Sequence, residues 1–223
     1  MCEQTVRRKF AMATSPDDTN ELLERASGGD AKALGALFMR HQDRLRRMVD
    51  LRMDRRLRGR LDPSDVLQES FLEFTRSLAD YLRRPELPFY VWLWMITGRK
   101  LQTLHRRHLG AQVRDAHRDV SLFHGALPQA SSECLAAQLL GRNTTPSEAA
   151  GRAELQIRVQ DALNSMDPID REILSLRHFE LLSNLEAAHV LGLSESAASN
   201  RFMRALKRLK KILIDVSGVG VDA

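Results

Sequence analysis

Apolar residues recur along this chain at intervals of three and four, the spacing that places side chains on one face of an α-helix. Asp30 can cap the first long helix, and a shorter helix over residues 20–26 is predicted before it, ending at Gly28 and Gly29. The apolar positions of the long helix are Leu34, Leu37, Phe38, Leu45, Met48 and Val49. Because no segment shows convincing strand alternation, we predict an all-α fold.

Two more helices are predicted between residues 62 and 108. Asp62 and Pro63 open the first, and Asp65 adds negative charge to its first turn, where the helix dipole favours it. The inward-facing residues of this helix are Leu67, Phe71, Phe74 and Leu78. The second helix follows a loop with two prolines and carries four of the chain's twelve aromatic residues: Phe89, Tyr90, Trp92 and Trp94.

Helical periodicity fades after residue 112, where one short helix around residues 133–140 is expected. Thr145 and Pro146 then open a helix that leads into the C-terminal segment. We therefore expect two small helical domains joined by a flexible linker. The expected divisions are a disordered extension (1–18), a first domain (19–112), the linker (113–145), a second domain (146–216) and a tail (217–223).

Three closely spaced helices are predicted to end the second domain. Asp167 and Pro168 open the first, and Ser183 can form a capping box with Glu186 at the start of the second. Gly192 ends the second helix, because a left-handed backbone is least costly without a Cβ. The third helix follows at once, with apolar positions Ala198, Phe202, Ala205, Leu206 and Leu209.

The last two of these helices have the spacing of a helix-turn-helix. Ala188 allows close approach, Gly192 makes the turn and Ala198 contributes to the shared core. Between residues 201 and 211 the third helix carries six basic residues and no acidic ones. This combination predicts a helix that binds the major groove of DNA.

The overall charge favours a polyanionic partner without identifying one. Lys and Arg number 34 against 29 Asp and Glu, a net charge of +5. Cys2 and Cys134 have no metal or redox spacing, which favours a reducing cytoplasm. No apolar run approaches transmembrane length and the N-terminus lacks the apolar core of a signal peptide, so we expect a cytoplasmic protein without membrane insertion. Met12 is an alternative start to Met1.

The aromatic helix continues into a basic stretch that includes Arg99 and Arg106. Aromatic faces beside guanidinium groups suit unstacked bases and their phosphates, although the aromatic residues could equally form the core. His105 and His108 could supply half of a metal site, but no third ligand accompanies them at helical spacing. We expect no metal, no cofactor and no enzymatic activity, since no nucleophile and base are paired.

The order of these segments resembles the extracytoplasmic-function (ECF) sigma factors of bacterial RNA polymerase, over residues 30 to 213 apart from the linker. Residues 65–69, Asp-Val-Leu-Gln-Glu, resemble the Asp-x-x-Gln-Glu motif of sigma region 2, and residues 89–93 resemble the segment before the minus-ten helix. Residues 191–195, together with Arg171-Glu172 and Arg201, resemble sigma region 4.

The resemblance implies three sets of binding residues. Those for the β′ clamp of polymerase are Asp65, Gln68 and Glu69. Those for the melted minus-ten strand are Tyr81, Trp92, Arg99, Lys100, Arg106 and Arg107. Those for the minus-35 duplex are Ser196, Ser199, Asn200, Arg201, Arg204 and Lys207. The implied partners are core RNA polymerase, through its β′ clamp and β flap, promoter DNA and, as a further candidate, an anti-sigma factor.

The sequence departs from the family at several positions. Arg99 stands where Asn is frequent, Leu181 where Gly is common, and Ala198 and Ser199 replace the usual Val and Lys. Nine arginines against three aspartates lie between residues 40 and 60, either as a solvated face or as a nucleic-acid attraction. Two other function classes stay open: a stand-alone operator-binding regulator, normally a two-fold dimer, and a nucleic-acid enzyme.

Overall fold

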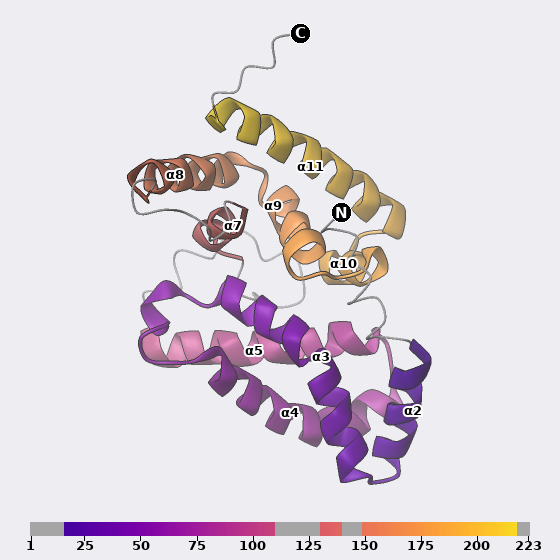
Figure 1. The fold of residues 1–223 in the computed structure, drawn as a ribbon. Coiled ribbons are helices and arrows are strands. Elements are labelled where there is room, and N and C mark those ends of the chain that lie inside the picture. Colours follow the sequence, from indigo (N-terminus) through magenta and orange to yellow (C-terminus); the bar gives the residue numbers. More distant parts are fainter. Residues whose placement is uncertain (1–15, 110–129, 140–148, 218–223) are drawn as a thin grey trace.

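The computed structural model describes residues 16–109, 130–139 and 149–217, and the regular elements in these ranges are all helical (Figure 1). The all-α prediction is confirmed. An N-terminal bundle contains α2 (Pro16–Ser27), α3 (Ala31–Arg52), the 3-10 turn η1 (Arg55–Leu57), α4 (Pro63–Arg83) and α5 (Phe89–Leu109). A C-terminal group contains α7 (Ser132–Leu139), α8 (Ala149–Ser165), α9 (Pro168–Leu174), the π-helical segment η5 (Ser175–Phe179), α10 (Asn184–Leu191) and α11 (Glu195–Ser217).

The N-terminal bundle begins and turns at the residues that the sequence indicated. The carboxylate of Asp30 accepts the backbone N–H groups of Lys32 and Ala33, and Gly29 adopts a φ of 87° just before it. Helix α2 is longer than expected, since it begins at Pro16, inside the segment predicted to be disordered. Asp62 caps α4 in a reciprocal capping box with Asp65.

The core of this bundle is built on Phe74, which is fully buried. Its ring lies 5.7 Å from that of Phe38 on α3 and 6.2 Å from that of Phe89 on α5, measured between centroids. Three helices therefore converge on one side chain of α4, which places the opposite face of α4 toward solvent.

The C-terminal group contains the predicted turn. Ser183 and Glu186 form the capping box of α10, and Gly192 ends this helix with a φ of 61°. Leu185 on this helix is 49% exposed, whereas Ala187 is buried. The short helix expected in the linker is present as α7. The helix opening predicted at residues 145–146 lies outside the described residues.

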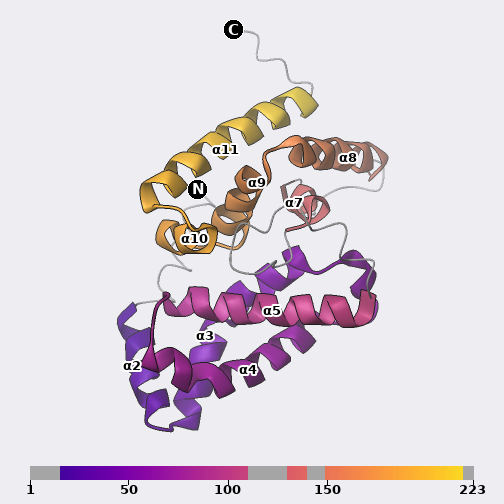
Figure 2. The ribbon, with the colours of Figure 1, turned by 180° about the vertical axis from the view of Figure 1, so that it is seen from behind.

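The two groups of helices lie against each other, an arrangement that the sequence did not indicate. Figures 1 and 2 show α10 beside α5 from opposite sides, with α7 between α8 and the N-terminal bundle. The backbone N–H of Ser131 donates to the carbonyl of Leu51 at 2.9 Å, and Arg55 forms an ion pair with Glu133 at 2.9 Å. Residues 131–133, at the start of α7, thus contact the end of α3 and η1.

Candidate nucleic-acid and protein interfaces

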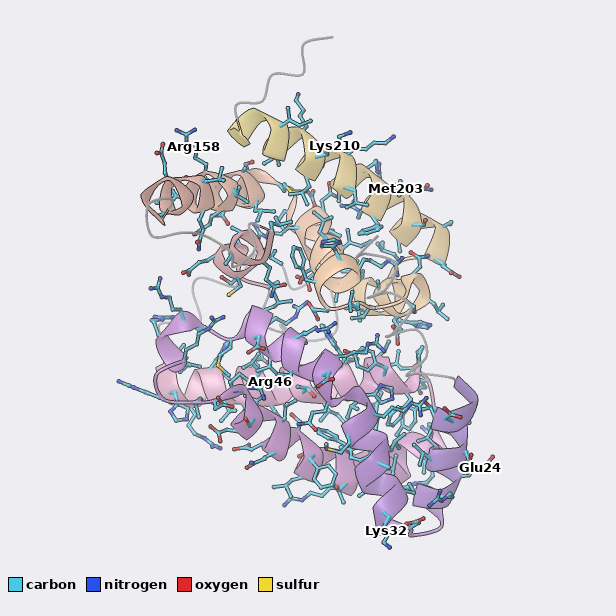
Figure 3. The ribbon with its side chains drawn as sticks, in the orientation of Figure 1. Glu24, Lys32, Arg46, Arg158, Met203 and Lys210 are labelled. Atoms are coloured by element: carbon cyan, nitrogen blue, oxygen red, sulfur yellow. The ribbon has the colours of Figure 1, made fainter. Side chains whose placement is uncertain are left out.

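Helix α11 presents a polar and basic stripe to solvent. Ala198, Ala205 and Leu209 face the core of the C-terminal group. The residues on the opposite face of the helix, which recur every three or four positions, are therefore exposed. The exposed members are Ser196, Ser199, Asn200, Met203, Arg204, Lys207 and Lys210. Figure 3 shows Met203 and Lys210 on the side of α11 that faces away from the N-terminal bundle. This stripe contains five of the six residues expected to bind duplex DNA.

The sixth, Arg201, occupies a different position. Its guanidinium lies 2.9 Å from Asp170 and 3.3 Å from Asp167, at the start of α9. Arg208 also pairs with Asp170, whose carboxylate is almost fully buried. Arg201 therefore joins α11 to α9, a role that the sequence did not reveal because Asp170 is thirty-one residues away. Its contact with bases stays a prediction.

Met203 is an apolar residue in this otherwise hydrophilic stripe, with 52% of its surface exposed. Apolar side chains contact the methyl group of thymine in the major groove. The sequence placed Met203 outside the apolar face of the helix without assigning it a contact, so the structure adds it to the candidate surface.

The acidic face of α4 lies opposite the core at Phe74. Asp65 and Gln68 are exposed, and Glu69 is partly exposed. One turn after Gln68, Leu72 is 55% exposed, which makes an apolar side chain part of the same face. The surface predicted for the β′ clamp is therefore followed, one turn further along α4, by an exposed leucine. Sequence reasoning missed Leu72 because it lies between two positions, 71 and 74, of the buried stripe.

The basic end of α5 is paired with the acidic face of α4. Lys100 forms an ion pair with Glu73 at 2.9 Å, and this contact lowers the pKa of the Glu73 carboxyl. Arg107 lies 3.8 Å from Glu69. Arg99 and Arg106 are exposed on the same helix. Of the four cations expected to meet the melted strand, two therefore have an acidic neighbour that a phosphate would have to replace.

The aromatic cluster divides into a buried and an accessible part. Phe89, Tyr90 and Trp94 are buried, as the core alternative predicts. Trp92 is half-buried and stacks on Tyr81, with 4.4 Å between ring centroids and 23° between planes. The Tyr81 hydroxyl donates to the carbonyl of Leu87 at 3.0 Å, and burial raises its pKa. Tyr81 and Trp92 are thus the partly exposed pair of the cluster.

The two histidines of α5 lie in different surroundings. His105 accepts the backbone N–H of Asp54 at 3.3 Å, while His108 is exposed. Across the part of the chain that the structure describes, no group of three His, Cys, Asp or Glu side chains could hold a metal ion. No helix in those ranges is both long and apolar enough to cross a membrane.

Comparison with known proteins assigns the chain to a family. The sequence model of sigma-70 region 4 matches residues 156–209. RNA polymerase sigma factor CnrH of Cupriavidus metallidurans is 30% identical over 203 residues, which cover 89% of this chain and 96% of CnrH. The chain belongs to the ECF sigma factors of RNA polymerase.

Two further likenesses agree with this assignment. RNA polymerase sigma factor NccH of Alcaligenes xylosoxydans xylosoxydans is 30% identical to this sigma factor over 202 residues, which cover 90% of this chain and 97% of NccH. A solved structure of CnrH in complex with the cytosolic domain of CnrY matches with a TM-score of 0.51 and 25% identity, covering 88% of this chain and 97% of that one.

In this sigma factor the match to region 4 runs from within α8 to near the middle of α11. It therefore includes the exposed stripe up to Lys207, the left-handed turn at Gly192 and the Asp170 contact between α9 and α11. The exposed face of α11 is the DNA-facing candidate within a matched DNA-binding region.

Proposed function

We propose that this sigma factor directs promoter-specific initiation through two domains, residues 19–112 as sigma region 2 and residues 146–216 as sigma region 4. The observation that carries the proposal is the exposed stripe of α11, which directly follows the left-handed turn at Gly192. A helix in this position of a helix-turn-helix enters the major groove, and its N-terminal residues contact base edges.

Region 4 would bind the minus-35 duplex with two kinds of contact. Ser196, Ser199 and Asn200 lie in the first two turns of α11 and would meet base edges. Arg204 and Lys207 lie one and two turns further along the same face and would neutralise phosphates. Arg201 also connects this helix to the start of α9 through Asp167 and Asp170, in addition to any contact that it makes with DNA.

Region 2 would hold polymerase and the melted strand on neighbouring surfaces. Asp65, Gln68 and Glu69, with the exposed Leu72 beside them, form a face with two carboxylates and one apolar side chain that suits the β′ clamp. The stacked pair of Tyr81 and Trp92 offers an aromatic platform for unpaired bases. The strand's phosphates would be met by the basic side of α5: Arg99, Lys100, Arg106 and Arg107.

The remaining partners follow from the same role. Region 4 would also bind the β flap of polymerase. The protein would act in the cytoplasm, as a binding factor without catalytic chemistry of its own. The CnrH structure contains a second protein, the cytosolic domain of CnrY. A comparable anti-sigma partner for this chain is part of the proposal.

Run-off transcription with core polymerase, with and without this protein, tests the proposal. We expect specific transcripts only with both components, and permanganate-reactive thymines near the start site. A variant with Lys207→Glu on α11 should lose transcription, because Lys207 is proposed to neutralise a phosphate, while Arg158→Glu, an exposed change on α8, should keep it. Tight binding of a two-fold operator by the protein alone, as a dimer, would instead identify a stand-alone regulator.

A further inference from the structure

Helix α11 is held at its first turn by a side chain of the preceding helix. Asn184, the first residue of α10, donates from its side-chain amide to the backbone carbonyl of Glu195 at 2.9 Å. Glu195 is the first residue of α11, and in an α-helix its carbonyl also accepts the N–H of Ser199, four residues later. The amide of Asn184 is therefore bonded to the turn that carries Ser196 and Ser199, two of the candidate base contacts.

A second contact holds α11 two turns further along. The guanidinium of Arg177, in the π-helical segment η5, lies 5.2 Å from the ring centroid of Phe202. The same guanidinium donates to the carbonyl of Leu182 at 2.6 Å, and Leu182 lies directly before Ser183, the cap of α10. Arg177 thus connects α11 to the point at which α10 begins.

Both contacts leave the exposed stripe of α11 accessible. Phe202 is partly buried and packs against the core, whereas Met203 and Arg204, which follow it, are exposed. The contacts to α11 come from α10 and η5, and neither Asn184 nor Arg177 belongs to the stripe. The two residues can therefore act on DNA binding without a place on the proposed DNA surface.

The first turns of α11 have little apolar packing of their own. Of residues 195–201, each of which the structure describes, Ala198 alone is buried. Its single methyl group can interdigitate only slightly with neighbouring side chains, and interdigitation is what fixes a packed helix in one orientation. The orientation of these turns therefore depends on polar contacts, which are the Asn184 amide at Glu195 and the ion pairs of Arg201.

Orientation matters more for base contacts than for phosphate contacts. N–H···O hydrogen bonds form at about 2.7–3.2 Å between heavy atoms and weaken steeply when the donor is misaligned. A cationic side chain attracts a phosphate over a longer range and with less directional demand. A small rotation of α11 would therefore break contacts between its first turns and base edges, and would leave the phosphate contacts of Arg204 and Lys207 in place.

We propose that Asn184 and Arg177 are positioning residues for promoter recognition, which orient α11 so that its first turns can read the minus-35 base pairs. This positioning role rests on the proposed function and adds two residues that contact neither bases nor phosphates. Their loss should change the preference for one promoter sequence over another, and should leave the general attraction to DNA unchanged.

The test uses holoenzyme assembled from the full-length protein and core RNA polymerase. Wild-type holoenzyme first selects promoter duplexes from a library randomised at both elements. Gel shifts in the cold, where the duplex stays closed, then compare a selected duplex with one whose minus-35 base pairs are scrambled. For Asn184→Ala we expect the ratio of the two affinities to fall at least about fivefold, as for the loss of one base contact. The salt slope and the melting temperature of the free protein should not change.

Two further variants complete the experiment. Asn164→Ala, at an exposed position of α8, is the matched control and should keep the wild-type ratio. Arg177→Lys keeps the charge but loses the planar guanidinium that lies over Phe202, so it should also lower the ratio. If thermal unfolding shows that Arg177→Lys is destabilised, Asn184→Ala alone decides.

Several results would overturn the positioning role. An unchanged ratio in Asn184→Ala, or an equal fall in Asn164→Ala, would do so directly. Equal weakening on both duplexes with a salt slope lower by about one would make Asn184 a phosphate ligand. Equal weakening with a lower melting temperature would make its role structural. If wild-type holoenzyme selected no minus-35 sequence at all, the proposed function would fail and the positioning role with it, which is distinct from a wild-type preference that the variants retain.

Discussion

Arg107 and Glu69 face each other across the contact between α5 and α4, with 3.8 Å between Nη1 and Oε1. One is a candidate for the melted strand and the other for the polymerase clamp. The two proposed surfaces of region 2 are therefore neighbours that share an electrostatic contact. A substitution on one surface can change the charge environment of the other.

Glu69→Lys should weaken association with core polymerase while leaving the fold intact. The side chain is partly exposed, and surface changes away from special features usually alter the free energy of unfolding by no more than about 0.5 kcal/mol. Binding would be measured by pull-down with core enzyme, and stability by thermal unfolding. Asp80→Lys, exposed near the other end of α4, is the charge-matched control. Lost stability with unchanged binding would show that the acidic face is structural.

Two changes on α11 should separate base contacts from phosphate contacts. Asn200→Ala should reduce discrimination between promoter sequences by roughly 1–3 kcal/mol. Lys207→Ala should weaken all sequences alike and lower the slope of log affinity against log salt by about one. Gel shifts on minus-35 duplexes at several salt concentrations measure both quantities. If Lys207→Ala changed sequence preference instead, the assignment along α11 would be reversed.

Arg201→Ala should lower stability, whatever it does to DNA binding. Its removal leaves the nearly buried Asp170 with Arg208 as its remaining ion-pair partner among the described residues, and a buried acceptor that loses a donor costs about 1–3 kcal/mol. Thermal unfolding of the variant measures the loss, with Arg204→Ala on the exposed side of the same helix as the control. A variant as stable as the wild type, with altered promoter preference, would show that Arg201 acts in DNA recognition and not in stabilising the fold.

Much of this architecture is predictable from sequence because its determinants are local. The capping residues Asp30, Asp62 and Ser183, and the left-handed Gly192, act within a single helical turn, and all lie where the sequence predicts them. Helical period likewise predicts which face of α11 is exposed.

The contacts that the sequence did not reveal join residues far apart in the chain. Arg52 and Glu180 are 128 residues apart, and Arg201 and Asp170 are 31 apart. The local sequence around an arginine that forms a buried ion pair is the same in pattern as the sequence around an arginine that faces solvent. The basic stretch between residues 40 and 60 was therefore ambiguous, and only the packing shows that two of its members meet acids of the C-terminal helices.

Stability should fall in mild acid because of His41. This side chain is buried against Phe89 and Tyr90, and neither ring nitrogen has a hydrogen-bond partner among the described residues. Burial, with the charges of Arg44 and Arg40, lowers its pKa from 6.5 to about 4, against a smaller opposing effect of Glu186. The unfolded chain thus binds a proton that the folded chain does not, between about pH 6.5 and pH 4.

In that window the contribution of His41 to stability should decrease by up to about 1.4 kcal/mol per pH unit as pH falls, and it should be fully present above pH 6.5. Urea unfolding at several pH values measures the slope. His41→Phe should flatten it, whereas His189→Phe, at an exposed position of α10, should not. Equal slopes in all three proteins would assign the acid sensitivity to other groups.

The positions of Trp92 and Trp94 give the protein two built-in optical probes. They are the chain's two tryptophans and lie two residues apart on one helix, yet the indole of Trp94 is sealed between the helix groups while that of Trp92 lies on Tyr81. With Trp92→Phe, the fluorescence emission wavelength of the remaining indole would report separation of the two groups of helices. With Trp94→Phe, quenching of the other would report a base stacking on it. Separation of the helix groups and base stacking could then be followed in the two variants separately, without attached dyes.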